Sequence, residues 1–263
     1  MINKVKIRSG ELKKVLPITN VKFDPGLTII WGKNGVGKSF LLKTIAKYCA
    51  VSCHGNGGGW TEPPIGFNYS YWNRDEKINL SDVYEFDEDS KLNIDWSGDP
   101  TFYMHHDDMI DWHHITGYMM GGSEWIKGIG DIWNKIIKEK HKHHPSSGQM
   151  IKGVIELLMD IDPPNLEADD RSRMRNDFPE YIKKRKEVFK GEFKPTIILD
   201  ETDSQLDLMN QIWFHEEVIP KLLEKYQVIL ASHSILSIRY ENVIDLDGSL
   251  PIIKEKAKEL LNL

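Results

Sequence analysis

Apolar residues gather in short, nearly continuous runs that are rich in β-branched and large aliphatic side chains. These runs span residues 27–31, 195–200, 227–231 and 243–246. Runs of this length without polar interruption are typical of strands buried on both faces. In the second half of the chain, segments with helical spacing of apolar residues alternate with them. The pattern predicts an α/β fold with a parallel central sheet covered by helices on both faces.

Two other patterns predict the remaining elements. Polar and apolar residues alternate over 2–8, and a short strand is expected at 18–23, which together favour an antiparallel β part. Apolar residues at helical spacing predict helices at 39–50, 131–140, 149–161, 207–226 with a bend near Pro220, and from about 252. A Gly/Pro-rich loop is expected over 51–67, followed by short strands at 67–72, 83–86, 91–96 and 101–104.

Composition limits the function classes. The 263 residues, 40% of them hydrophobic, suffice for one large α/β domain over 1–263, within which 51–144 is a divergent β and helical region. The net charge of −6 argues against a generally basic nucleic-acid-coating protein. Two cysteines and no apolar run near ~20 residues indicate a reducing, cytoplasmic location without membrane insertion.

One stretch of the sequence matches a known phosphate-binding pattern. The residues from Gly32 to Ser39 match the phosphate-loop pattern G-x-x-x-x-G-K-[ST], between a predicted strand and a predicted helix. Its nucleotide-binding residues are expected to be Gly32, Lys33, Asn34, Gly35, Val36, Gly37, Lys38, Ser39 and, next along the helix, Phe40. In such loops backbone N–H groups surround phosphate oxygens, Lys38 reaches the β and γ phosphates, and the Ser39 hydroxyl binds Mg²⁺.

Further candidates lie where strands end or a helix begins. Asp200 ends a buried strand, as a magnesium-binding aspartate does, and Glu201 follows it as a carboxylate able to orient or deprotonate water. His233 lies just past the next buried strand, at the carboxyl edge where open α/β sheets bind ligands. The run Ser146, Ser147, Gly148 and Gln149 precedes a helix, so its N–H groups offer a second anion site.

The order of these motifs resembles the ABC-type ATPases, and more closely their soluble branch, which includes SMC-like, RecF-like and OLD-like members. The approach to the phosphate loop from Phe23 to Gly35 is similar to that branch, and 145–149 resembles the family signature LSGGQ. The run from Glu201 to Asp207 is similar to the segment from the catalytic glutamate through the D-loop, and His233 takes the place of the switch histidine. The resemblance covers 1–50 and 145–247; residues 51–144 match only by position.

The resemblance implies that two ATP molecules, each with Mg²⁺ at Ser39 and Asp200, are sandwiched in a head-to-tail dimer. Lys38, Glu201 and His233 would act catalytically on one face, with Asp207 also at the nucleotide. Ser146 to Gln149 would contact the γ phosphate from the other copy. ATP rather than ADP would then favour dimerisation, because a helix N-terminus attracts the additional anion.

Three departures from the family pattern stand out. No glutamine precedes Gln149, so His105 and His106 occupy the place of the Q-loop glutamine. Ser147 replaces the first glycine of the signature. Asp200 follows Gln149 after an unusually long interval, so 162–194 is expected to be a helical insertion. That insertion is basic, which leaves nucleic-acid contact open beside a merely solvated face.

These observations predict an ATP-hydrolysing ABC-type ATPase whose ATP-dependent dimerisation controls a protein effector or a nucleic-acid transaction. The resemblance alone suggests DNA repair or anti-phage (antiviral) defence as the setting. Two alternatives remain: the ATPase subunit of an ABC membrane transporter, and a nucleotide-sensing scaffold that does not hydrolyse ATP. The absence of the Q-loop glutamine and the length of the insertion count against the transporter.

Overall fold

The centre of the molecule is a parallel β-sheet. The computed structural model describes residues 1–53, 90–97, 99, 101–105, 147–160 and 194–261. Within these residues the sheet has six strands in the order β4-β6-β7-β8-β3-β9, and every neighbouring pair is parallel. Its strands are β3 (Leu27–Trp31), β4 (Ala50–Cys53), β6 (Thr101–His105), β7 (Thr196–Asp200), β8 (Gln227–Ser232) and β9 (Val243–Asp245). The predicted α/β class with a parallel sheet is confirmed.

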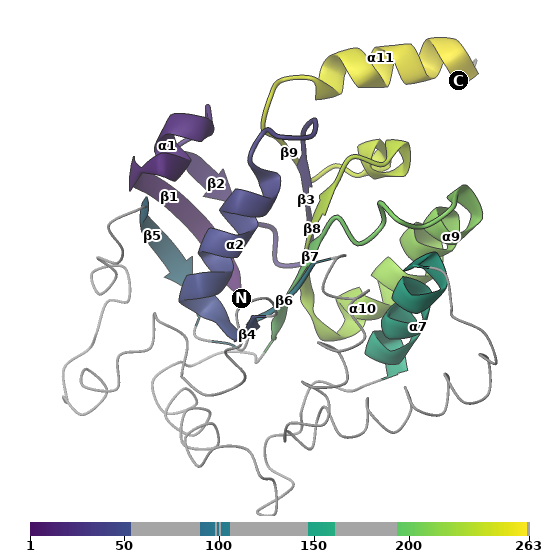
Figure 1. Ribbon diagram of the computed structural model, residues 1–263, viewed down its shortest axis with the longest axis horizontal. Coiled ribbons are helices and arrows are strands. Elements are labelled where there is room, and N and C mark those ends of the chain that lie inside the picture. Colours follow the sequence, from purple (N-terminus) through teal and green to yellow (C-terminus); the bar gives the residue numbers. More distant parts are fainter. Residues whose placement is uncertain (54–89, 98, 100, 106–146, 161–193, 262–263) are drawn as a thin grey trace, which may run out of the picture.

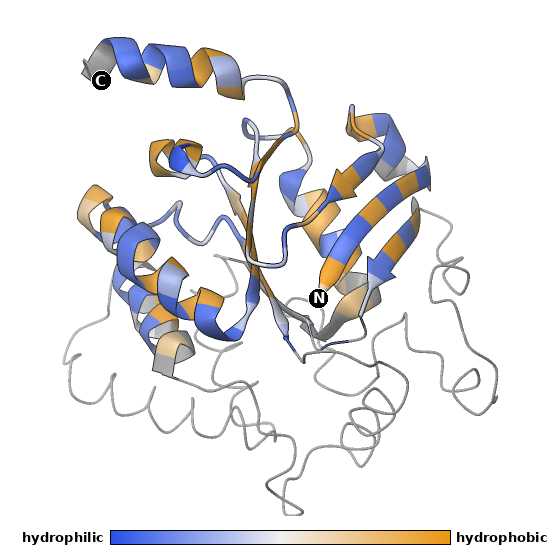
Figure 2. Ribbon diagram, turned by 180° about the vertical axis from the view of Figure 1, so that it is seen from behind, coloured by the Kyte–Doolittle hydropathy of each residue, from blue (hydrophilic) through white to orange (hydrophobic). Residues whose placement is uncertain are grey.

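A second, smaller sheet is antiparallel and has the order β2-β1-β5 among the described residues. It consists of β1 (Ile2–Gly10), β2 (Asn20–Lys22) and β5 (Ser90–Trp96). Inward-facing Val5 and Ile7 alternate with exposed positions along β1, which is visible as alternating orange and blue bands in Figure 2. The predicted antiparallel part is therefore confirmed. Of the strands expected between 67 and 104, β5 joins it, whereas β6 joins the central sheet.

Helices cover both faces of the central sheet. Helix α2 (Lys38–Cys49) contacts strands of both sheets and lies between them. On the other side lie α7 (Ser147–Asp160), α9 (Leu208–Trp213) and α10 (Ile219–Lys225), as Figure 1 shows. The chain continues through the 3₁₀ turn η3 (Ile235–Arg239) to α11 (Leu250–Leu261), and a short helix α1 (Glu11–Val15) follows β1.

The long helix predicted for 207–226 is interrupted just before its proline. Phe214–Val218 forms a π-helical turn, η2, between α9 and α10. Pro220 lacks an N–H group and cannot donate to a carbonyl of the preceding turn, which explains why the regular hydrogen-bond pattern is interrupted in that turn. The irregularity near Pro220 takes the form of one wide turn that carries the buried His215.

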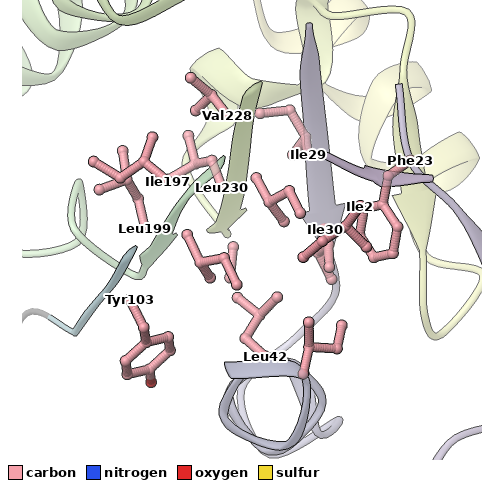
Figure 3. Packing of buried hydrophobic residues seen from close by; sticks show 14 of the residues in the cluster. Ile2, Phe23, Ile29, Ile30, Leu42, Tyr103, Ile197, Leu199, Val228 and Leu230 are labelled. Atoms are coloured by element: carbon pink, nitrogen blue, oxygen red, sulfur yellow. The ribbon is translucent and has the colours of Figure 1, made fainter. Parts of the chain in front are cut away.

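The core lies between α2 and the central sheet. Leu42 of α2 faces side chains of β3, β7 and β8, as Figure 3 shows, and all are buried. A polar residue lies within this core: Gln227, fully buried at the start of β8. Its amide donates to the carbonyl oxygens of Ile2 (2.7 Å) and Asp24 (2.8 Å). Its oxygen accepts from the N–H of Ile2 (2.7 Å) and the hydroxyl of Thr196 (2.8 Å). All four hydrogen-bonding positions of the amide are thus used.

One local prediction is wrong, and one short helix was missed. The expected loop 51–67 begins inside strand β4, which runs to Cys53 and pairs with β6. The helix α1 was not predicted, because five residues are too few to show a helical period. The expected strands 67–72 and 83–86, the helix 131–140 and residues 162–193 of the insertion 162–194 lie outside the described residues. No helix within the described residues is long and apolar enough to cross a membrane.

Candidate active site

The phosphate loop connects β3 to α2 through a tight backbone path that needs glycine. Gly37 has a φ of 102°, a left-handed conformation that side chains rarely adopt. A Cβ atom at Gly32 would lie 2.6 Å from a methyl carbon of Val36. The first N–H groups of α2, from Lys38 onward, have no partner within a helix and so are available to an anion. This arrangement fits a phosphate group.

Lys38 lies inside the loop rather than in solvent, since only 3% of it is exposed. Its ammonium donates to the carbonyl oxygens of Gly32 (2.9 Å) and Lys33 (3.3 Å). It is also 3.2 Å from the Glu201 carboxylate oxygen Oε1. A cation held this close to both the loop and a carboxylate can balance the charge of a bound phosphate.

Ser39 and Asp200 meet across the end of the sheet. The Ser39 hydroxyl donates to Asp200 Oδ1 over 3.0 Å, and Asp200 is fully buried. The other carboxylate oxygen, Oδ2, accepts a hydrogen bond of 2.7 Å from the Tyr103 hydroxyl. A hydroxyl and a carboxylate are hard oxygen donors of the kind that Mg²⁺ prefers, so the pair fits a magnesium ion. No sequence pattern indicated this role for Tyr103.

Glu201 occupies a strained backbone position beside this pair. Its φ is 54°, and it is the sole non-glycine residue with positive φ in the part of the chain that the structure describes. Its N–H donates to the carbonyl of Ala231 (3.0 Å), which joins the ends of β7 and β8. Its Oε1 lies 4.0 Å from His233 Nδ1, and 40% of that histidine side chain is exposed. The structure thus brings Lys38 and His233 together beside the carboxylate of Glu201.

A further carboxylate, that of Asp247, contacts the phosphate loop. Asp247 follows β9, and its Oδ2 accepts a hydrogen bond of 3.2 Å from the N–H of Lys33. Its Oδ1 accepts from the hydroxyl and N–H of Ser249. These hydrogen bonds, with that from the Ser249 hydroxyl the largest effect, hold the pKa of Asp247 below its usual value. The sequence indicated only a turn at this position.

The remaining predicted residues lie elsewhere. Phe40 is partly exposed on α2. Asp207 caps α9, where its carboxylate accepts from the N–H and the side chain of Asn210. These bonds lower the pKa of Asp207, the backbone bond most. Ser147, Gly148 and Gln149 open α7, on the side of the sheet opposite α2 (Figure 1), and Ser146 lies outside the described residues.

Two further observations concern metal-binding clusters and the Q-loop position. No group of three or more His, Cys, Asp or Glu side chains arranged for a metal ion occurs among the described residues. The strand register pairs His105 with Asp200, so the chain position expected to replace the Q-loop glutamine adjoins the site. Residue 106 lies outside the described residues. Cys49 packs into the core, and burial raises the pKa of its thiol.

No protein-family model and no curated protein matches this chain. Among solved structures it is similar to a protein from Pyrococcus furiosus described as an ABC transporter ATP-binding protein, with a TM-score of 0.45 and 16% identity over 93% of this chain and 98% of that one. It is also similar to cbiO1 from Clostridium perfringens, part of the ABC transporter complex cbiONQ, with a TM-score of 0.42 and 14% identity over 98% of this chain and 92% of that one. Similarity at this level carries no functional argument, so the site has to be interpreted from its own residues.

Proposed function

We propose that this chain is an ABC-type ATPase of the soluble branch that hydrolyses ATP to ADP and phosphate. The observation that supports it best is that Lys38 and His233 both lie beside the Glu201 carboxylate, next to Ser39 and Asp200. In this arrangement a phosphate-binding cation, a base and a polar side chain at the edge of the sheet adjoin a pair of magnesium-binding oxygens.

Each residue has a distinct task in this proposal. The loop 32–39 and Lys38 hold the β and γ phosphates, and Ser39 and Asp200 hold Mg²⁺, which neutralises charge on the phosphate oxygens. Glu201 orients the attacking water and accepts its proton. His233 lies beside the same oxygen of Glu201 that Lys38 contacts, and it helps to place the γ phosphate. ATP and Mg²⁺ are the expected ligands.

The second part of the proposal is ATP-dependent head-to-tail dimerisation. The signature-like helix α7 starts on the face opposite α2, so a second copy is the natural source of an anion-binding helix start over the loop 32–39. In this proposal Ser146 to Gln149, with Asp207 nearby, contact the nucleotide bound by the partner copy. The dimer then controls a protein effector or a nucleic-acid transaction, of the DNA-repair or antiviral-defence kind.

The deciding experiment measures phosphate release from ATP and Mg²⁺ by the purified chain and by Glu201→Gln. We expect turnover by the wild type, loss of turnover by the variant, and accumulation of an ATP-bound dimer of the variant in size-exclusion chromatography. Wild-type binding of ATP without turnover would instead support a nucleotide-sensing scaffold. Failure of the wild type to bind ATP at all would refute the whole proposal.

The effector is sought separately, by capturing partners of the tagged Glu201→Gln variant with ATP or ADP present. We expect at least one partner to be retained with ATP and lost with ADP. Co-purification of a membrane permease would favour the transporter alternative over the soluble branch.

A further inference from the structure

A buried polar cluster adjoins the loops that carry Glu201 and His233. None of its residues has a role in the function proposed above. Its centre is the carboxylate of Asp203, of which 1% is exposed. Asp203 Oδ2 accepts a hydrogen bond of 2.5 Å from the Ser232 hydroxyl and lies 3.3 Å from His215 Nε2. His215 is equally buried, and its Nδ1 is 3.3 Å from the Tyr240 hydroxyl.

A carboxylate this deeply buried costs much free energy unless donors satisfy it. The Ser232 hydroxyl donates to Asp203 Oδ2, and His215 donates to the same oxygen in the tautomer that carries its proton on Nε2. His215 lies in the π-helical turn Phe214–Val218, an irregular geometry that occurs frequently at functional sites. An irregular turn that presents a histidine to a buried carboxylate is a costly arrangement for filling space alone.

The cluster connects the two loops that carry the candidate catalytic groups. Asp203 is two residues beyond Glu201, and Ser232 directly precedes His233. The Ser232 hydroxyl also accepts from the N–H of Ser234 over 3.0 Å, so it binds the chain on both sides of His233. Together with the bond from Glu201 N–H to the Ala231 carbonyl, the Asp203–Ser232 bond ties the two loops at two points.

We propose that Asp203 and Ser232 are positioning residues, held by His215, that fix Glu201 and His233 relative to each other for the hydrolytic step. This inference rests on the proposed ATPase function. Glu201 keeps a left-handed backbone that it would leave if the loop were free, and two crosslinks to β8 prevent this. The loop 32–39 is held by its own contacts with Lys38, Asp200 and Asp247, so nucleotide binding is separable from the positioning.

The test compares Asp203→Asn and Ser232→Ala with the wild type. Asp203→Asn keeps the shape of the side chain and removes its charge, and Ser232→Ala removes the hydroxyl that crosslinks the loops. We expect kcat to fall roughly 10- to 100-fold, the range that a displaced catalytic group produces. The Kd for a non-hydrolysable ATP analogue is expected to change by less than about threefold, because the phosphate-binding loop is untouched.

The chain offers a matched control in the same two segments. Glu216, next to His215, forms an exposed ion pair of 3.1 Å with Arg239, next to Tyr240. Glu216→Gln removes the charge of this surface ion pair between η2 and η3 and leaves the buried cluster intact. We expect its kcat and Kd to equal those of the wild type.

A double-mutant cycle separates positioning from general structural damage. If Asp203 acts by placing His233 and Glu201, Asp203→Asn will lower kcat much less in a His233→Ala background than in the wild type. Equal fold-losses in both backgrounds would mean that the two residues act independently, and would overturn the positioning role.

The other outcomes are equally decisive. Wild-type turnover with unchanged kcat in both Asp203→Asn and Ser232→Ala overturns the inference and leaves the ATPase proposal standing. A parallel loss of analogue binding and of thermal stability in both variants assigns the cluster a structural role only. If Asp203→Asn does not fold, Ser232→Ala decides alone. Absence of turnover in the wild type, by contrast, refutes the ATPase proposal itself and the positioning role with it.

Discussion

Tyr103 offers a sharp test of how the candidate magnesium site is held. The side chain is 1% exposed and points from β6 toward the side of the sheet on which α2 lies (Figure 3). It donates a hydrogen bond of 2.7 Å to Asp200 Oδ2. Tyr103→Phe removes this donor without adding volume or shifting the strand. The buried carboxylate then loses one partner while keeping the Ser39 hydroxyl on its other oxygen.

The size of the effect follows from the charge on the acceptor. Hydrogen bonds to charged groups contribute about 1.5–3 kcal/mol, so the unfolding free energy is expected to fall by that amount. For a chain of this length the loss corresponds to about 3–12 °C in Tm. Loss of a residue that orients a metal-binding side chain weakens metal affinity by about tenfold or more. We therefore expect the Mg²⁺ concentration for half-maximal turnover to rise about tenfold.

The assay measures both consequences on one preparation. Unfolding in urea gives the stability, and titration of Mn²⁺ into the nucleotide-bound protein, followed by electron paramagnetic resonance of the free ion, gives metal affinity independently of turnover. Thr101→Val is the control, since it removes a hydroxyl from the same strand whose bond to the Asp99 carbonyl is long, at 3.4 Å. Metal affinity in Tyr103→Phe equal to that of the control would refute the reasoning.

Three further predictions concern single residues. Cys49 is 1% exposed with a raised thiol pKa, so iodoacetamide at pH 8 should modify it only after unfolding, as mass spectrometry of native and denatured samples will show. Because Glu201 has a φ of 54°, Glu201→Gly should be more stable in urea than Glu201→Ala by about 1 kcal/mol, the reverse of the usual order. The pKa of Asp247 is lowered in the folded protein, so the stabilisation from this carboxylate is present above the usual value of 3.8 and is lost as pH falls through the lower folded-state pKa. The difference in unfolding free energy between the wild type and Asp247→Asn should therefore shrink below about pH 4.

The parts of the structure that the sequence predicted are those with local signals. The strand–loop–helix unit around Gly32 to Ser39 needs only an apolar run, glycines and a helical period, all of which are adjacent in the chain. Asp200 and His233 were found for a similar reason, because each ends or follows a buried strand. Parallel strands align their carboxyl ends, so these residues had to lie at one edge of the sheet.

The parts that the sequence did not predict depend on contacts between distant segments. That β6 lies beside β7, and so brings the Tyr103 hydroxyl to Asp200, is set by strand order, which apolar runs do not encode. The histidine that contacts Asp203 lies in one wide turn before a proline. A proline indicates that a helix is disturbed but not how many residues the disturbed turn contains.

The buried amide of Gln227 has a consequence for how the molecule opens. Its four hydrogen bonds join β8, which carries Gln227, to Ile2 of β1 in the small sheet, to Asp24 in the turn before β3, and to Thr196 of β7. Separating the small sheet from the large one would leave these groups without partners in a dry environment, at a cost of about 1–3 kcal/mol for each. The two sheets should therefore open together, so that amide hydrogens of β1 and β8 exchange with solvent deuterium as one cooperative unit.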